Sequence, residues 1–97
     1  MGLALLCGVY LLALDGWGNP AHAVLDLLVN GRQVGEIDWY CKRARERSHS
    51  ITVGVPWTGV HQLVGRCDRS SADADRPTRH WICLKRLRMQ RLGPMST

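Results

Sequence analysis

The sequence from Ala23 to Trp39, AVLDLLVNGRQVGEIDW, contains two apolar runs on either side of the pair Asn30 and Gly31. Asparagine and glycine are the residues that most readily adopt the positive φ angles of a tight hairpin turn. The stretch therefore predicts a β-hairpin, and we treat this hairpin as the nucleus of the fold.

Two registers fit this hairpin. A two-residue Asn-Gly loop would place Leu25 opposite Glu36. A three-residue loop that begins at Val29 would place Leu25 opposite Gly35, and it would put the glycine of the turn at a bulge position. We expect the three-residue loop, because it also sets Ala23 against Ile37 and gathers apolar side chains on one face. That face comprises Ala23, Leu25, Leu27 and Ile37.

The chain has 97 residues, of which 45% are hydrophobic, and this fits a single small domain with one thin core. Thirteen Lys and Arg residues against eight Asp and Glu residues give a net charge of +5. Eleven of the basic residues are arginine, whose guanidinium binds carboxylates and phosphates through paired hydrogen bonds. The charge therefore favours acidic partners.

A second hairpin is expected after the first. Residues 51–55, ITVGV, alternate apolar and polar or small side chains, which is typical of a half-buried strand. Pro56 ends this strand, and the sequence PWTG is typical of a turn. Residues 60–67 then read as the returning strand. The two strands would pair side by side in one sheet.

Helices and a last strand complete the predicted fold. Asp38 can accept hydrogen bonds from the first turn of a helix, so a short helix through Arg47 is expected. The polar tract 68–79 reads as a surface loop, and His80 to Leu84 as a last strand. The predicted fold class is α+β and β-rich. Two hairpins and a C-terminal strand would form a small antiparallel sheet or a partly open barrel, with one or two short helices.

The first 23 residues have two interpretations. The apolar run from Leu3 to Leu14 is too short to cross a bilayer as a helix. Followed by Ala21 and Ala23, it matches a signal peptide cleaved after Ala23, although no Lys or Arg precedes it and Asp15 lies close by. The alternative is a retained core helix or strand. The predicted units are residues 1–23, a domain over 24–92 and a tail over 93–97; a cleaved protein would be secreted or periplasmic, a retained one cytoplasmic.

Four cysteines leave two further alternatives. In an exported protein, Cys83 would form a disulfide with Cys67 or with Cys41, and the bond would staple a small core. In a cytosolic protein, Cys67, His80 and Cys83 would hold zinc together with His61 or Cys41, although one such pair is a weak signal. Unpaired buried thiols are the plain alternative, and we predict no metal site.

The sequence contains no glycine-rich phosphate loop, nucleophile elbow, HExxH or CxxC motif. We therefore expect a protein that is not an enzyme, has no cofactor and acts on no small-molecule substrate. The leading hypothesis is a binding module, of inhibitor or accessory type, that recognises an acidic protein. Trp and Arg are favoured at binding hot spots. The predicted partner-binding residues are Trp57, Trp81, Arg43 and Arg45.

The C-terminal segment supports an alternative function. No acidic residue follows Asp75, and basic residues alternate with apolar ones up to Gly93. Such a segment is typical of proteins that bind nucleic acid, alone or in a ribonucleoprotein, or an anionic membrane surface. The phosphate-binding residues would be Lys85, Arg86, Arg88 and Arg91. The high arginine content and the lack of phenylalanine would also fit a recently arisen reading frame without a refined site.

Overall fold

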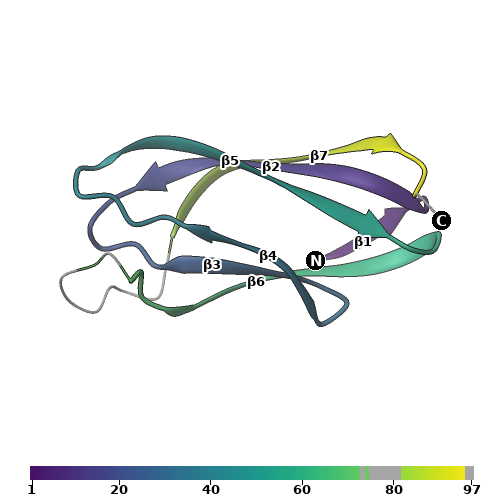
Figure 1. Ribbon diagram of the computed structural model, residues 1–97, viewed down its shortest axis with the longest axis horizontal. Coiled ribbons are helices and arrows are strands. Elements are labelled where there is room, and N and C mark those ends of the chain that lie inside the picture. The colour runs from purple at the N-terminus through teal and green to yellow at the C-terminus, as the bar shows by residue number, and fades with distance from the viewer. Residues whose placement is uncertain (73, 75–81, 96–97) are drawn as a thin grey trace.

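The computed structural model describes residues 1–72, 74 and 82–95, and these residues form seven strands and no helix (Figure 1). The fold is therefore all-β, and the predicted α+β class with one or two helices is wrong. The strands are β1 (Gly2–Leu5), β2 (Gly8–Gly18), β3 (Val24–Val29), β4 (Arg32–Asp38), β5 (Arg45–Val55), β6 (Gly59–Arg69) and β7 (Cys83–Gly93).

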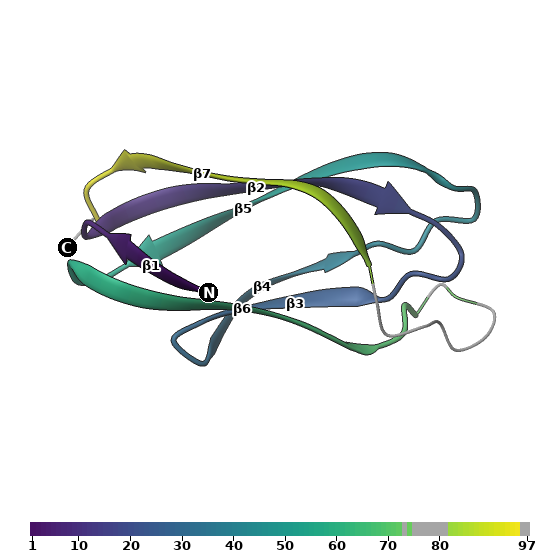
Figure 2. The ribbon, with the colours of Figure 1, turned by 180° about the vertical axis from the view of Figure 1, so that it is seen from behind.

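The strands form two antiparallel sheets that pack face to face as a sandwich (Figures 1 and 2). The first sheet has the order β1-β6-β3-β4 and the second the order β5-β2-β7. The core between them centres on Trp39, which is fully buried. Six further buried side chains, contributed by both sheets, complete the core cluster: Leu12, Leu14, Leu25, Leu27, Ile37 and Leu63.

The N-terminal apolar run forms two strands rather than a helix. β1 lies at the edge of the first sheet, and β2 is the central strand of the second. Along β2 the side chains alternate between buried and partly exposed, so that Tyr10, Leu12 and Leu14 face the core. This period of two is what a strand requires, so of the helix or strand that the sequence allowed, the strand is the one that forms.

The hairpin over β3 and β4 is present, but the predicted three-residue loop is wrong. Asn30 and Gly31 have φ angles of 52° and 81° and form a two-residue turn that sets Val29 opposite Arg32. Val34 is then an extra residue in β4, and this bulge places Leu25 opposite Ile37. The predicted apolar face is nevertheless buried: Ala23, Leu25, Leu27 and Ile37.

β5 and β6 do not form the predicted second hairpin. The turn at Pro56 reverses the chain, but β5 pairs with β2, whereas β6 pairs with β1 and β3 in the other sheet. The residues between them therefore connect the two layers of the sandwich. A turn sequence of this kind predicts that the chain reverses, and it does not say whether the next strand stays in the same sheet.

The predicted helix from Asp38 to Arg47 is also absent. The Asp38 carboxylate accepts a hydrogen bond from the backbone N–H of Tyr40 at 2.9 Å, which makes a local turn. An Asp carboxylate can accept such a hydrogen bond at the start of a helix or in a turn, and here the chain continues into β5. The last strand, β7, extends well beyond the predicted end at Leu84, while His80 lies outside the described residues.

Candidate functional site

The strongest charged feature is a group of six cations on the second sheet and on the adjoining connection between β4 and β5. β2 lies between β5 and β7, so Asp15 on β2 has Ser48 of β5 on one side and Arg86 of β7 on the other. Lys85, Arg86 and Arg88 of β7 are thereby brought to the same end of the sheet as the start of β5 and the connection that precedes it. We call this the basic surface and define it as Lys42, Arg43, Arg45, Lys85, Arg86 and Arg88.

Part of the basic surface surrounds a shallow hollow of about 460 Å³ over β5, β2 and β7. Two carboxylates lie within it. Lys85 forms an ion pair with Glu46, and Arg88 lies 3.4 Å from a carboxylate oxygen of Asp15. These pairs hold two of the six cations against the sheet.

Asp15 is also fixed by its neighbour on β5. The Ser48 hydroxyl donates a hydrogen bond of 2.7 Å to the Asp15 carboxylate. This bond lowers the pKa of Asp15, and the nearby charges of Arg88, Arg86 and Lys85 lower it further, against a smaller opposing effect of burial. Asp15 therefore stays ionised at neutral pH, and it neutralises only one of the positive charges around it.

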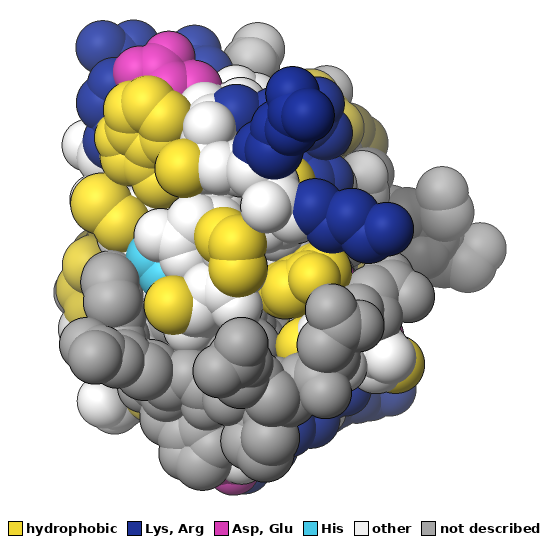
Figure 3. Space-filling model, turned by 90° about the vertical axis from the view of Figure 1, so that its left-hand side faces the viewer, with side chains coloured by type: hydrophobic (Ala, Val, Ile, Leu, Met, Phe, Trp, Pro, Cys, Tyr) yellow, Lys and Arg dark blue, Asp and Glu magenta, His cyan; other side chains and the backbone are white. Residues whose placement is uncertain are grey.

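A second hollow, of about 350 Å³, lies at the end of the sandwich that Figure 3 faces, where Lys and Arg side chains gather in the upper half of the view. It is lined by Cys41, Lys42, Arg43 and Arg45. Arg47 holds the adjoining chain in place by donating to the carbonyl oxygens of Asp38 and Tyr40 and to the Cys41 sulfur.

Four of the six cations form no ion pair with another described residue. Within residues 1–72, 74 and 82–95, no ion pair involves Lys42, Arg43, Arg45 or Arg86. The basic surface therefore presents six positive charges against two carboxylates, and it is suited to an anionic ligand.

The predicted partner-binding residues do not form one surface. Arg43 and Arg45 belong to the basic surface, whereas Trp57 lies two residues after the end of β5, at the opposite end of the sandwich (Figure 1). Trp57 is 49% exposed, and its ring stacks on that of His61 at a centroid distance of 3.9 Å. Trp81 lies outside the described residues.

Buried His61 fixes the turn that carries Trp57. Its Nε2 donates to the Trp57 carbonyl at 2.8 Å, so Nδ1 is the acceptor for the Asn30 amide at 2.9 Å. The side-chain oxygen Oδ1 of Asn30 in turn accepts from the backbone N–H of Gln62. Trp57 is therefore part of a structural network that ties the β5–β6 turn to the β3–β4 hairpin.

The predicted phosphate-binding residues lie together on β7, but three of the four have partners. Lys85 and Arg88 form the ion pairs described above, and Arg91 donates to the carbonyl oxygen of Cys7 at 2.8 and 3.3 Å. Only Arg86 among the four is without an ion pair or hydrogen bond to a described residue. The β7 segment by itself is therefore a poor phosphate-binding strip.

All four cysteines are free thiols, so the predicted disulfides are absent from the structure. Cys67 and Cys83 belong to different sheets. Burial raises the pKa of the Cys67 thiol above its ordinary value, with smaller contributions from Asp26 and Asp68. In the described part of the chain, no three His, Cys, Asp or Glu side chains are grouped as a metal ion would require.

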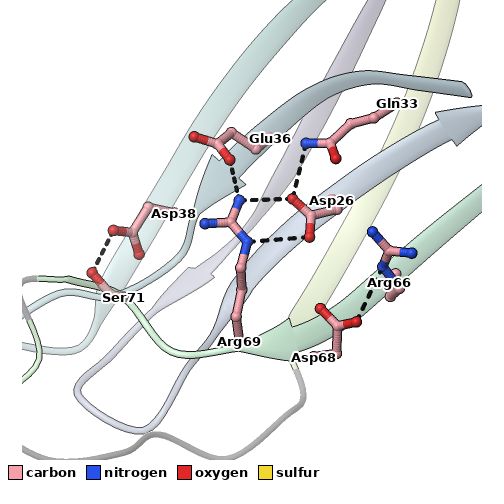
Figure 4. A network of polar contacts seen from close by, with 8 residues as sticks. All are labelled: Asp26, Gln33, Glu36, Asp38, Arg66, Asp68, Arg69 and Ser71. Carbon is pink, nitrogen blue, oxygen red and sulfur yellow. Dashed lines mark hydrogen bonds and ion pairs between the residues drawn. The ribbon is translucent and has the colours of Figure 1, made fainter.

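Sequence reasoning missed a polar network on the first sheet (Figure 4). Asp26 is 2% exposed and accepts two hydrogen bonds from Arg69, at 2.8 and 3.3 Å, and one from Gln33 at 3.2 Å. Arg69 also pairs with Glu36. The hydrogen bonds from Arg69 lower the pKa of Asp26 despite its burial, so the carboxylate is ionised.

This network joins β6, β3 and β4, and we assign it a structural role. Its signal in the sequence is Asp26 itself, the only charged residue in the apolar run from Ala23 to Val29. A buried carboxylate requires a partner, and the sequence does not indicate which arginine supplies it.

Comparison with known proteins gives no relative from which a function could be inferred. No protein-family model, curated protein or solved structure matches this chain. Among the described residues there is no helix that could cross a membrane.

Proposed function

We propose that the protein is a small non-enzymatic binding module that holds an acidic segment of a partner protein on the basic surface. The observation that carries the proposal is the set of four cations, Lys42, Arg43, Arg45 and Arg86, which form no ion pair with any described residue. They come from three parts of the chain and line two hollows, one over the second sheet and one at the β4–β5 connection.

The arrangement of charge favours a flexible acidic chain over a single small anion. The two hollows are shallow, and the unpaired cations are spread along β5, β7 and the β4–β5 connection. Charges in such an exposed site act over a distance of about 8 Å at physiological ionic strength. An extended acidic segment could contact several of them at once, and the field would also speed its association.

An acidic protein segment is favoured over nucleic acid by the state of β7. A nucleic acid would need several free cations in a row, and Lys85, Arg88 and Arg91 are already engaged with Glu46, Asp15 and Cys7. Binding of a duplex is therefore an outcome that the experiment must distinguish.

The test is a titration of the full chain with a fluorescent ten-residue peptide of alternating Asp and Ser. Arg86→Ala should weaken binding by about two- to fivefold, as expected for one exposed ion pair. Arg66→Ala is the matched control, because Arg66 is equally basic but lies on β6 of the other sheet. It should change the affinity by less than about twofold.

Three results would contradict the proposal. The first is equal weakening by both substitutions, which would indicate attraction by net charge alone. The second is an affinity that does not fall between about 0.1 and 1 M salt, over which the screening length shrinks from about 10 to about 3 Å. The third is tighter binding of a DNA duplex that shows the same dependence on Arg86, which would favour the nucleic-acid alternative.

A further inference from the structure

The four edges of the two sheets differ in how they are protected against pairing with another strand. β1 has only four residues, β4 carries the bulge at Val34, and β7 has two register shifts where it pairs with β2. Short edge strands and bulges are the usual means of preventing strand addition. β5 has neither, since it pairs with β2 over eleven residues in one continuous register.

A hollow of about 570 Å³ lies along the second half of β5. It is lined by three consecutive residues of β5, 52–54, and three consecutive residues of β4, 32–34. Successive residues of a strand point to opposite faces, so consecutive lining residues place the hollow at the strand edges. It therefore opens between the free edge of β5 and the free edge of β4. Its apolar lining comprises Val29, Val34, Val53, Pro56 and Met95.

The hollow is closed toward the start of β5. There Gly35 of β4 lies against Ile51, and a Cβ at Gly35 would be 2.7 Å from the Ile51 side chain. Beyond this point Arg47 binds the β4–β5 connection beside the strand. The accessible part of the edge is therefore residues 52–55.

Of the polar side chains that line the hollow, the charged one, Arg32, is available to a ligand. Two others already have partners: Asn30 bonds with His61 and Gln62, and Gln33 donates to Asp26. Arg32 is exposed and forms no ion pair with any described residue. A ligand with a carboxylate at this end would compensate the charge of Arg32.

We propose that the edge of β5 over residues 52–55 accepts an extended peptide segment of a partner protein as an added strand. The backbone of the segment pairs with β5, an aliphatic side chain enters the apolar hollow, and a carboxylate lies toward Arg32. Strand addition of this kind takes its affinity from backbone hydrogen bonds and its specificity from alternate side chains. The site is separate from the basic surface, because it lies at the other end of β5.

The probe is the acetylated peptide Thr-Val-Thr-Val-Asp, and the measurement is amide hydrogen exchange of the full chain by NMR. At a free peptide concentration of about nine times its Kd, exchange at the exposed amides of residues 52–55 should slow by about tenfold. The control peptide has the same side chains, with both valine nitrogens methylated, so that it lacks two of the backbone donors.

Two variants test the contribution of charge. Arg32→Ala should weaken binding of the probe by about two- to fivefold, because it removes one exposed ion pair. Arg66→Ala, on the outer face of the first sheet, should leave binding unchanged. The probe has only one side-chain carboxylate, so Arg86→Ala should also leave it unchanged, whatever the fate of the basic surface.

Three outcomes would overturn the proposal. Equal binding of the methylated peptide would show that backbone pairing is not involved. Slowed exchange on β1 or β7, with none on β5, would place the peptide on another edge. Protection of β5 that rises with protein concentration in the absence of peptide would show that a second copy of this chain occupies the edge instead.

Discussion

Alanine substitutions along β2 test whether the N-terminal run is a core strand. Leu12 is 0% exposed and Leu14 is 1% exposed. Leu11, the residue before Leu12, lies on the outer face of β2 and is half-buried. Replacing a buried leucine by alanine costs about 2–5 kcal/mol, since both the transferred surface and a cavity contribute. The total stability of a domain of this size is about 5–15 kcal/mol. Leu12→Ala should therefore remove a large fraction of it.

The assay is equilibrium unfolding in urea, followed by the fluorescence of tryptophan, because Trp39 is fully buried in the core. We expect Leu12→Ala and Leu14→Ala each to lower the free energy of unfolding by about 3 kcal/mol. With an m-value of about 1.5 kcal/mol/M, the urea midpoint would fall by about 2 M. Leu11→Ala should cost less than about 1 kcal/mol, because it removes only partly buried surface.

The pattern of the three losses decides between the alternatives. In a helix Leu11 and Leu14 would share a face, so both would be sensitive and Leu12 would not. If residues 1–23 lay outside the folded domain, none of the substitutions would move the midpoint. Either result would refute the assignment of this run to the centre of the second sheet.

Two further predictions concern a glycine and a histidine at the core. Gly16→Ala should lower the free energy of unfolding by about 1–3 kcal/mol, because its Cβ would lie 2.4 Å from the Cys83 carbonyl oxygen and 3.1 Å from the Trp39 ring. Gly93→Ala is the control: a Cβ there would have nothing within 4 Å, so the variant should be near neutral in the same urea assay. Burial lowers the pKa of His49 below its ordinary value, so the native state disfavours the protonated ring. The free energy of unfolding should therefore be unaffected by His49 above about pH 6.5 and should fall as the pH drops below that value. His49→Phe should make this fall smaller. The measurement is the urea midpoint at several pH values between 7 and 5.

The sequence predicted the β3–β4 hairpin because its turn is local. Asn30 and Gly31 specify a reversal by their backbone preferences alone, and the apolar face around Leu25 followed from alternation. The register was wrong because the turn has two residues rather than three and because β4 has a bulge at Val34. This bulge belongs to a strand whose Gly35 lies against Ile51 of the other sheet, and no pattern within the hairpin encodes a contact between sheets.

The sequence shows which segments are basic, but it does not show how these segments are arranged in space. The sequence indicates that Arg43, Arg45 and the segment that forms β7 are basic, but nothing in it places β7 and β5 on either side of β2. Trp57 is predicted to bind a partner because tryptophan is favoured at binding hot spots, but its stacking on His61, which also bonds to Asn30, 31 residues away, is not encoded in the local sequence. Local patterns thus identified the charged segments, whereas the strand order that joins them is set by the packing of whole strands.

The cations of β7 have a second physical role that any test of binding must separate from the first. β7 is an edge strand, and charged side chains on an edge prevent pairing with other sheets. This protection depends on how many charges β7 carries, whereas binding at the hollow beside Asp15 depends on where they lie.

Arg86 and Gln90 share the outer face of β7 and are about 13 Å apart along the strand. Arg86→Gln combined with Gln90→Arg keeps the charge of the edge and moves one cation away from the hollow. If the basic surface binds an acidic segment, the double variant should remain monomeric and bind the Asp-Ser peptide about two- to fivefold more weakly. If β7 only protects its edge, both properties should be unchanged.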